Sequence, residues 1–543
     1  MKKGAKIALW IVGSLVVLVV GAFLCADIIA SRLVQKEVQK AFAQMPDADA
    51  KVGGIYLNLI SGSAIVKDIT FCTNSLAWED TIPGQREPGL AIHIPTLSVW
   101  NIHYWDLLRE HRVVVHRISL DDPTLLVYID EKNPESILPK FPKDTTLDKA
   151  EIWLKSVEIR HFDLEDFSAR IHSTRSPLKV ALDSLTTEVN DISYDLTDSL
   201  FAYNDSVYLL SIKGLKAELP DGASEVELHD LKTKDQGPLT LGYTRYHKIV
   251  TLKHLADVRR EPTTWIDIEV NAVNTSAFNP IRKILAQDWT LESIDADVRR
   301  LYVRRDTRYP PKEPYSNPQD FLRKLPVQFK LKQVTALARK IDIDMQTTDI
   351  NCGEMHIKNA RGKMTNVTNR TGATWYNYGK APFGANGIVE AKYDIHMNKS
   401  VTFDISIKGS DIETSELNSF IRPLVGITSE CHIDKLDAAY SGDRNMTTGT
   451  FCMQYHGLNV KVHKEDKIPY EIVTKNADFF TSAANSLVPK SNPSTVDPAP
   501  RAYEVEWKQD VWKPYPLFLF GPCIDGIKKT MLPGLYVHKQ TKK

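Results

Sequence analysis

From about residue 46 onward, apolar and polar residues alternate along most of this chain. In the segment VTFDISI (401–407) every second residue is apolar and the residues between them are polar. Successive side chains of a β-strand point to opposite faces, so this period predicts strands with one apolar and one polar face. One-sided strands of this kind form antiparallel or meandering sheets with one face in water. The same alternation recurs at 125–129, 266–270, 327–331, 341–345, 393–397, 451–455 and 458–462.

Helical patterns are few and short. We predict a helix at 28–42, short helices at 277–287 and 415–421, and single turns or little more at 105–110 and 318–324. The chain is therefore predicted to be mainly β. Breaks between modules are expected at two segments rich in proline, 307–320 and 489–500.

The run IALWIVGSLVVLVVGAFLCA (7–26) contains no charged residue and is long enough to cross a bilayer as one helix. Lys2, Lys3 and Lys6 precede it. The run exceeds the usual core of a signal peptide, and no clean cleavage pattern accompanies it. We therefore expect an uncleaved anchor, with the N-terminus in the cytoplasm and most of the chain on the other side. The anchor residues are Ile7, Leu9, Trp10, Leu15, Val20 and Phe23.

Composition narrows the class of function. The chain has 68 basic and 68 acidic residues, and this balance argues against nucleic acid as the main partner. No GxSxG, HExxH, Walker A or GxGxxG motif is present, so we expect no enzyme activity, no metal site and no cofactor. The six cysteines lack CxxC spacing. A disulfide between Cys431 and Cys452 is one interpretation, and isolated thiols are the other.

Three acidic pairs and one basic cluster were considered as sites. A carboxylate pair can act as a catalytic dyad, but all three pairs alternate with apolar residues, which favours a solvated strand face. The pairs are Asp163/Glu165, Asp295/Asp297 and Asp342/Asp344. The basic cluster fits either contact with anionic headgroups or a charged strand edge. It consists of Arg299, Arg300, Arg304, Arg305 and Arg308.

Apolar residues near the C-terminus also have two interpretations. They form a patch that contacts a membrane or partner, or they pack as a cap on the last strand. These residues are Trp512, Phe518, Phe520, Ile524, Ile527 and Leu532.

Segments at both ends of the chain follow one another in a recognisable order. YLNLISGSAIVKDITF (56–71) fits a hairpin, and residues 97–130 fit a strand, a short helical turn with Leu107 and Leu108, and two further strands. WLKSVEIRHFDLEDFSARI (153–171) follows as a strand pair. In this order the segments resemble the N-terminal part of the AsmA-like family of bacterial envelope proteins, which is related to TamB and to the bridge-like lipid transfer proteins.

The C-terminal part resembles the same family. Residues 416–462 are similar to its C-terminal module, and PLFLFGPCIDGIKKTMLPG (516–534) resembles its terminal amphipathic segment. The matching positions in 416–462 are Asn418, Phe420, Pro423, Tyr455 and Leu458.

The resemblance implies a long antiparallel β-sheet, folded into a groove with an apolar interior, behind a single transmembrane helix. It further implies a protein that binds and conducts phospholipid and supports outer-membrane lipid homeostasis. On this basis we expect an inner-membrane location with the bulk of the chain periplasmic, and membrane phospholipids and an outer-membrane or envelope protein as partners. The expected parts are an anchor (1–45), a β groove (46–308), a C-terminal β module (321–488) and a C-terminal strand and tail (501–543).

The candidate groove residues are the apolar positions of the clearest alternating segments. They are Val327, Phe329, Leu331, Tyr393, Ile395, Val401, Phe403, Ile405, Ile407, Leu458 and Val460.

Three alternatives remain open at this level. The same apolar faces could pack against each other in β-sandwiches. The sheet edges could assist the assembly of outer-membrane β-proteins by strand addition, without conducting lipid. The chain could also be a membrane-tethered hydrolase whose site no motif reveals.

Overall fold

The computed structural model describes residues 27–36, 38–40, 48–73, 88–132, 155–195, 200–235, 237–278, 289–315, 317–325, 327–347, 352–463, 477–495, 497–531 and 539–540. The anchor predicted at 7–26, nearly all of the helix predicted at 277–287, and Leu532 lie outside these ranges. Among the described residues, no helix combines the length and the apolar character needed to cross a membrane.

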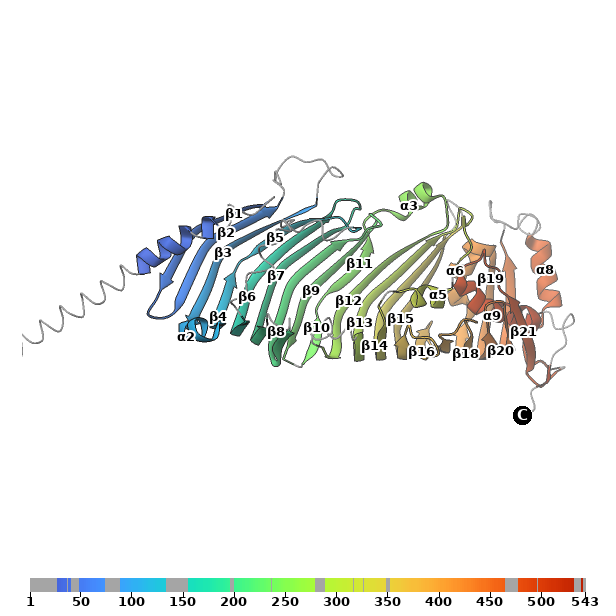
Figure 1. The fold of residues 1–543 in the computed structure, drawn as a ribbon. Coiled ribbons are helices and arrows are strands. Elements are labelled where there is room, and N and C mark those ends of the chain that lie inside the picture. The colour runs from blue at the N-terminus through green and yellow to red at the C-terminus, as the bar shows by residue number, and fades with distance from the viewer. Residues whose placement is uncertain are drawn as a thin grey trace, which may run out of the picture. The chain divides into compact units, whose positions relative to one another are not determined.

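The protein is mainly β, as the alternation predicts, and most strand pairs are antiparallel (Figure 1). The chain divides into two compact units, Met1–Leu241 and Gly242–Lys543, called unit 1 and unit 2 below.

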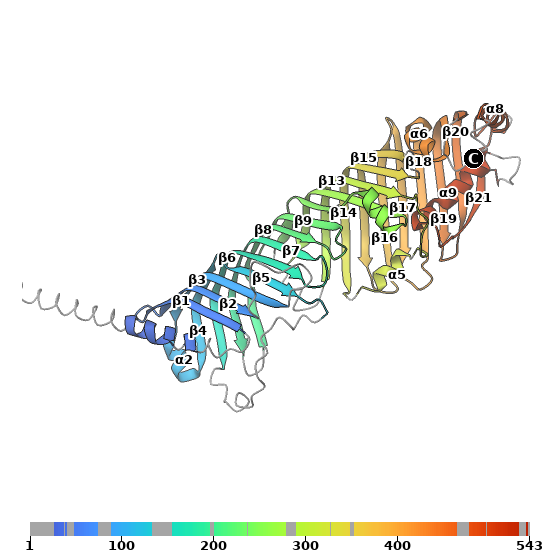
Figure 2. The ribbon, with the colours of Figure 1, turned by 90° about the horizontal axis from the view of Figure 1, so that it is seen from above.

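Unit 1 is built from strands that lie side by side, mostly in chain order (Figures 1 and 2). The exceptions to antiparallel pairing are β4 and β5, which pair in succession with β6 in parallel. The strands are β1 (Ala48–Asn58), β2 (Ser63–Thr73), β3 (Gly89–Ile102), β4 (Arg112–Asp121), β5 (Thr124–Ile129), β6 (Ser156–Ser173), β7 (Lys179–Asp195), β8 (Leu200–Glu218), β9 (Ser224–Lys234) and β10 (Pro238–Leu241). Residues 27–36 and 38–40 are helical, and α2 (Tyr104–Glu110) joins β3 to β4.

Unit 2 has the same one-layered strand order, with helices added towards its C-terminal end. Its strands are β11 (Thr244–Lys248), β12 (Thr263–Ala277), β13 (Trp289–Asp306), β14 (Phe329–Gln346), β15 (Cys352–Thr368), β16 (Thr374–Phe383), β17 (Gly387–His396), β18 (Phe403–Glu413), β19 (Ile427–Gly442), β20 (Met446–Val462), β21 (Arg501–Lys508) and β22 (Lys539–Gln540). Its helices are α3 (Leu252–Arg259), α5 (Pro318–Arg323), the 3-10 turn η3 (Thr414–Leu417), α6 (Asn418–Val425), α8 (Ala477–Leu487) and α9 (Tyr515–Met531). The helices or turns expected at 28–42, 105–110, 318–324 and 415–421 therefore coincide with helical residues.

The proline-rich segment 307–320, expected as a break between modules, lies inside unit 2. It connects β13 to β14, and these two strands pair in parallel from Trp289/Phe329 to Asp306/Gln346. A parallel pair needs a crossover connection between its strands, and this segment, together with α5, supplies it. The boundary between the compact units instead follows β10.

One row of irregular positions interrupts the strand pairing across unit 1. A second row, through Asn101, Arg160 and Asp191, interrupts the pairing between β3 and β8 as well. At the positions of the first row the register skips at least one residue, so the cross-strand ladder is broken along a line. We call this line the crease. It consists of Gly53, Asp68, Pro95, Asp122, Asp166, Ser184, Lys213 and Asp230.

The backbone explains which residue types occur in the crease. Asp68, Asp122, Asp166, Ser184 and Asp230 have φ between 50° and 53°, in the left-handed region where Asp and Asn are enriched among residues with a Cβ. Such a residue within a strand acts like a β-bulge, which bends the strand and changes its twist. A row of them therefore bends all the strands of unit 1 along one line.

The crease also explains a break in the sequence pattern. On β6, Leu164 and Phe167 are three residues apart, and strict alternation would place them on opposite faces. The irregular Asp166 between them allows both to point to the same face. In unit 2 the register also skips a residue at Arg299 on β13 and at Asn359 on β15. The apolar residues on either side of each skip are again three residues apart.

The buried core of the described residues gathers where α9 covers the apolar side of β18–β21 in unit 2 (Figure 2). The Phe518 ring of α9 meets the Phe403 ring of β18 edge-on, with centroids 5.7 Å apart. Tyr440 donates a hydrogen bond of 2.8 Å to the Leu519 carbonyl. Burying a side chain as large as Phe403 stabilises the fold by about 1.5–3 kcal/mol.

Two glycines allow α9 to approach this closely. A Cβ on Gly526 would lie 2.2 Å from the Phe451 ring, and one on Gly521 would lie 2.3 Å from the Trp507 ring. Both distances are far below van der Waals contact, so α9 packs here because these positions have no side chain.

Candidate functional site

The candidate site is a continuous apolar surface on one side of the sheet in unit 1, called the apolar face. The strand register aligns apolar residues of successive strands in rows that run across the strands. One row is Leu57, Ala64, Val99, Ile118, Phe162, Val189 and Tyr208. The next is Ile55, Val66, Leu97, Leu120, Leu164, Thr187, Leu210 and Thr233.

The rows continue beyond the crease. The row on its other side is Phe71, Ile92, Leu125, Ala169, Leu182, Leu215 and Leu228. Because direct cross-strand partners point to the same face, the three rows form one apolar surface from β1 to β9.

Most of these side chains are half-buried, although the sheet of unit 1 is a single layer. In the part of unit 1 that the structure describes, α2 packs beside β4 and residues 27–40 lie along β1. Strands β5–β9 therefore present their apolar residues without a covering helix. Isolated exposed hydrophobics are ordinary on protein surfaces, whereas a contiguous apolar surface marks a site of binding.

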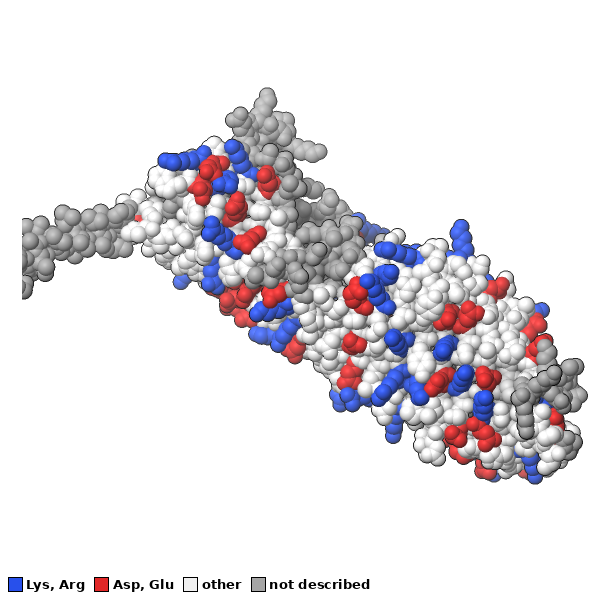
Figure 3. Space-filling model, turned by 90° about the horizontal axis from the view of Figure 1, so that it is seen from below, with Lys and Arg blue, Asp and Glu red and all other residues white. Residues whose placement is uncertain are grey.

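The opposite face carries ion pairs between neighbouring strands. Lys216 on β8 pairs with Glu225 on β9 at 2.8 Å, and this contact raises the pKa of Lys216. Figure 3 shows Lys and Arg interspersed with Asp and Glu on the face seen there. The polar side chains of each strand therefore pair across the sheet on the side that faces water.

One group on this polar face has ligand atoms close enough together to hold a metal ion. Atoms of His161, Asp163 and Glu188 all lie within 4.8 Å of one another. Both oxygens of the buried Asp163 are already bound, one by His161 Nε2 at 2.9 Å and the other by Arg117 Nε. The group is therefore a satisfied ion-pair network, and we assign no metal to it.

The acidic pairs considered as catalytic dyads are also paired with cations or hydrogen-bond donors. Asp297 accepts two bonds from Arg339, at 2.8 and 2.9 Å, and this contact lowers the pKa of Asp297. Burial alone would raise the pKa of Asp342, but bonds from Lys340, His356 and Arg300 outweigh burial and lower it. Both carboxylates lie on the polar face of their strands, but the buried Asp342 is not solvated as the alternation predicts, because its cationic neighbours cover it.

The arginine cluster lies on β13 and just after it, and β13 is not an edge strand, because β12 and β14 pair with its two sides. The charged-edge interpretation is therefore wrong. Arg300 binds Asp342 at 3.0 Å, Arg305 binds the Tyr315 hydroxyl at 2.7 Å, and Arg308 binds Asp306 at 2.6 Å. Contact with headgroups gains no support, since these guanidinium groups already have partners within the protein.

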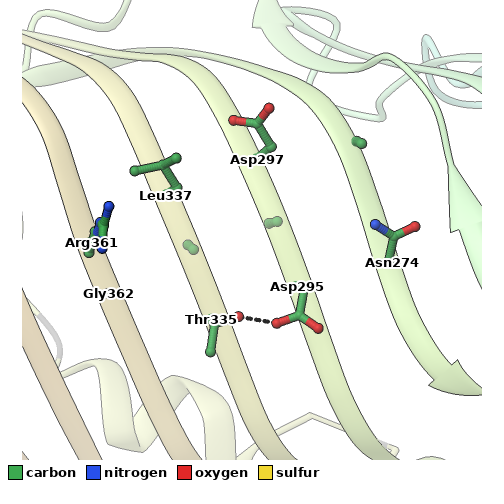
Figure 4. A pocket seen from close by; sticks show the side chains of 10 residues that line it. Asn274, Asp295, Asp297, Thr335, Leu337, Arg361 and Gly362 are labelled. Carbon is green, nitrogen blue, oxygen red and sulfur yellow. Dashed lines mark hydrogen bonds between the residues drawn. The ribbon is translucent and has the colours of Figure 1, made fainter.

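The polar side of β12–β15 has a shallow depression of about 450 Å³ (Figure 4). Asp295, Asp297, Leu337 and Arg361 contribute to its walls, and Thr335 donates a hydrogen bond to Asp295. Because Asp295 and Asp297 are engaged by Thr335 and Arg339, the depression offers no free pair of carboxylates.

The structure corrects the choice of groove residues. Phe403, Ile405, Ile407 and Leu458 belong to the buried core, so the protein's own packing covers them. Tyr393 and Val460 pack against that core.

The other candidate groove residues differ from one another. Val401 is buried and precedes β18 with φ of 57°, and the exposed Val327 precedes β14. Phe329, Leu331 and Ile395 are half-buried on β14 and β17. The structure therefore does not bring the candidate residues together as one open surface.

Unit 2 does leave part of its apolar side open. A row of small residues crosses β13–β17, formed by Ala296, Ala336, Gly362, Gly379 and Ala391. A Cβ added at Gly362 or Gly379 would meet nothing within 4 Å. The space above these two glycines is therefore unfilled, in contrast to the space beside Gly526.

The C-terminal apolar residues divide into covered and exposed ones, and contact of the exposed ones with a membrane or partner stays a prediction. Phe518 is buried and Ile524 is half-buried, as expected of a cap on the last strands, whereas Trp512, Phe520 and Ile527 are exposed. Cys431 and Cys452 are both free thiols, so the disulfide interpretation is wrong.

The sequence predicts a groove over residues 46–308, but the candidate groove residues chosen from it include no residue of the apolar face, because they were taken from the segments with the clearest strict alternation. The signal that could have found it is the three-residue spacing that recurs in each strand, as in Leu182/Leu185, Ile212/Leu215 and Leu228/Leu231. Compared with known proteins, the chain matches no family model and no curated protein.

Proposed function

We propose that the apolar face binds the acyl chains of phospholipid and conducts them across the strands, in a membrane-anchored protein of the cell envelope. The observation that carries the proposal is the register, which aligns mostly apolar side chains in rows that together extend from β1 to β9, with no helix over β5–β9 in the described part of unit 1.

The rows suit a molecule that must keep its tails out of water. Each methylene moved from water to an apolar surface contributes about 0.8 kcal/mol. Successive strands lie about 4.8 Å apart, so an acyl chain lying along a row contacts several strands at once. It can advance by one strand without exposing all of its tail, and the barrier to movement is small at each step.

The crease supports a groove-shaped site. Apolar residues line both sides of it, such as Leu164 and Phe167 on β6 and Ile212 and Leu215 on β8. Bending a sheet along this line turns the two apolar halves towards each other if the apolar face is the concave one. Their half-buried state in a single layer agrees with that direction of bending.

Strand addition, the mechanism of the alternative assembly factor, has less support. Side chains of residues 27–39 bind backbone groups of the outer strand β1. On β20, Asn485 of α8 accepts from the Val460 amide at 2.9 Å and donates to the Val460 carbonyl at 2.7 Å. An incoming strand would have to displace these contacts at β1 and along the part of β20 that β21 does not pair with.

Crosslinking from the two faces of one strand tests the proposal. A photoreactive amino acid is placed at Leu185, on the apolar face of β7, and at Glu188, on its polar face, in the full chain extracted gently from membranes. We expect mass spectrometry to find phospholipid attached at position 185 and little at position 188. Equal labelling at both positions, or none at 185, would contradict lipid binding by the apolar face.

A further inference from the structure

The helix that precedes β1 has a row of polar side chains that faces the sheet. Every fourth residue of this helix binds backbone of β1 or of the turn that follows it, on the side of β1 that does not pair with β2. Leu59 N donates to Asp27 Oδ1 at 2.9 Å, Leu57 N donates to Ser31 Oγ at 2.8 Å, Gln35 Nε2 donates to Gly53 O at 3.1 Å, and Gln39 Nε2 donates to Val52 O at 3.3 Å. These four bonds fix which side of the helix faces the protein.

The opposite side of the same helix exposes two large apolar residues, next to Lys40. Leu33 is 60% exposed and Ile29 is 59% exposed, and Ile28 and Val34 are exposed as well. A helix on a soluble protein normally buries its apolar side and leaves its polar side in water. Here the arrangement is inverted, so the apolar side is placed to contact something outside the chain.

Charge and shape beside this apolar side favour a membrane surface. Arg32 and Lys36 are exposed one helical turn apart, next to the apolar residues. A recess of about 470 Å³ opens between the helix and β1. Its polar lining is Asp27, Ser31, Arg32 and Gln35, and its apolar lining includes Ile28 and Tyr56. The Asp27 carboxylate accepts a hydrogen bond from Leu59 N, and Arg32 is the cation in the recess. A cation beside apolar surface suits a phospholipid with an anionic headgroup. The sequence leading into the helix is the uncharged run 7–26.

We propose that the helical residues 27–36 and 38–40 lie on a membrane surface, with Ile29, Leu33 and Val34 among the upper acyl segments. Arg32 and Lys36 contact anionic phospholipid headgroups, one of which occupies the recess against β1. The inference deepens the proposed function, since it places the β1 edge of unit 1 at the membrane from which lipid would enter. It rests on the anchor at 7–26 but not on conduction along the apolar face.

Photocrosslinking in bilayers tests this placement. The full chain is reconstituted in vesicles of phosphatidylglycerol and phosphatidylethanolamine, with the photoreactive amino acid at Leu33. The matched control is Leu487, which is 74% exposed on α8, the helix that covers the β20 edge of unit 2. We expect lipid adducts at position 33 at least tenfold above those at position 487. Equal yields at the two positions would overturn the proposal.

Headgroup preference provides a second measurement. R32E and K36E together should lower the share of phosphatidylglycerol among the adducts at position 33 at least threefold, and K253E on the exposed side of α3 should leave it unchanged. An unchanged share in the double variant would overturn the role of the two cations. Labelling at Leu185 reports the apolar face separately, so failure of lipid conduction and failure of this membrane contact give different results.

Discussion

Strands β7 in unit 1 and β18 in unit 2 each have one apolar side, but their apolar residues have different surroundings. On β18, Phe403 is only 1% exposed, and Phe518 of α9 packs on it. On β7, Leu182 and Leu185 are half-buried, and the contacts described for unit 1 place no helix over them. The comparison shows that alternation identifies the apolar side of a strand, whereas a distant segment decides whether that side becomes a core or remains a surface.

A charge introduced on the apolar side should reduce stability much more in the core of unit 2 than on the apolar face of unit 1, and this is the largest difference that we expect. F403D places an unpaired carboxylate in the core under α9, and we expect it to reduce the free energy of unfolding of unit 2 by about 4 kcal/mol or more. I212D, on β8 of the apolar face, should cost about 1 kcal/mol because water reaches that side chain, yet it should lower the phospholipid that co-purifies.

Denaturant unfolding of the full chain, combined with limited proteolysis, measures both effects. Similar losses of stability in F403D and I212D would show that the apolar face of unit 1 is covered as completely as the core of unit 2, and the proposed lipid surface would then be wrong.

Adding one methyl group at matched glycines tests the same contrast on the apolar side of unit 2. The Cβ of G526A would lie 2.2 Å from the Phe451 ring, so α9 has to shift, and we expect a loss of about 2 kcal/mol. The Cβ of G379A meets nothing within 4 Å, so this variant should stay within about 0.5 kcal/mol of the parent chain. Thermal unfolding measures both variants, and equal shifts in Tm would contradict the open space above β16.

Removing the side-chain amide of Asn485, which binds the backbone of β20, should reduce the stability of unit 2. N485A removes both hydrogen bonds to Val460 and leaves a backbone amide and carbonyl of β20 without these partners, which should cost about 1–2 kcal/mol. The exposed edge should also promote self-association, which sedimentation velocity would detect. S486A, whose hydroxyl bonds only within α8, is the control and should leave both properties unchanged.

The sequence predicts the strands well because an apolar residue at every second position, repeated over many residues, is typical of β-strands and not of helices. It also indicates α9 as an apolar C-terminal segment, since Phe518 and its neighbours stand out beyond the last strand. It does not indicate that α9 packs closely on β20 and β21 at its two glycines. Gly526 lies against Phe451 and Gly521 against Trp507, and these contacts join segments that are distant in the sequence. This is why Phe403 and Ile405, which have the clearest alternation, were interpreted as groove residues and are core residues instead.

The crease shows a second limit, in which the local sequence contains each irregular position but not their alignment. Asp166 and Ser184 break the alternation of β6 and β7 at the same row, and Ser184 donates a hydrogen bond to Asp166. Each break considered alone resembles a loop or the end of a strand. Only the register shows that the breaks align, and this alignment makes one bent sheet from strands that each carry an irregular residue.

The smallest effect that we expect is a pH dependence of stability from His432, on the polar side of β19. His432 on β19 binds Glu413 at 2.7 Å, and Asp434 and Asp411 lie nearby, so its pKa is raised above 6.5, chiefly by the bond with Glu413. The protonated imidazole is favoured in the folded protein. Its contribution to stability is therefore complete below pH 6.5 and is lost as the pH rises through the higher folded pKa.

Because the side chains of His432 and Glu413 are partly exposed, solvent screens their interaction, and the change in stability should be small. NMR titration of the imidazole should give a pKa above 6.5 in the parent chain and a lower value in E413Q. The phospholipid bound by unit 1 should not follow this titration, since His432 lies on a strand whose apolar side is closed by the core. If lipid binding does change with the protonation of His432, the covered and open regions are coupled, and the contrast between β18 and β7 is not one of independent surfaces.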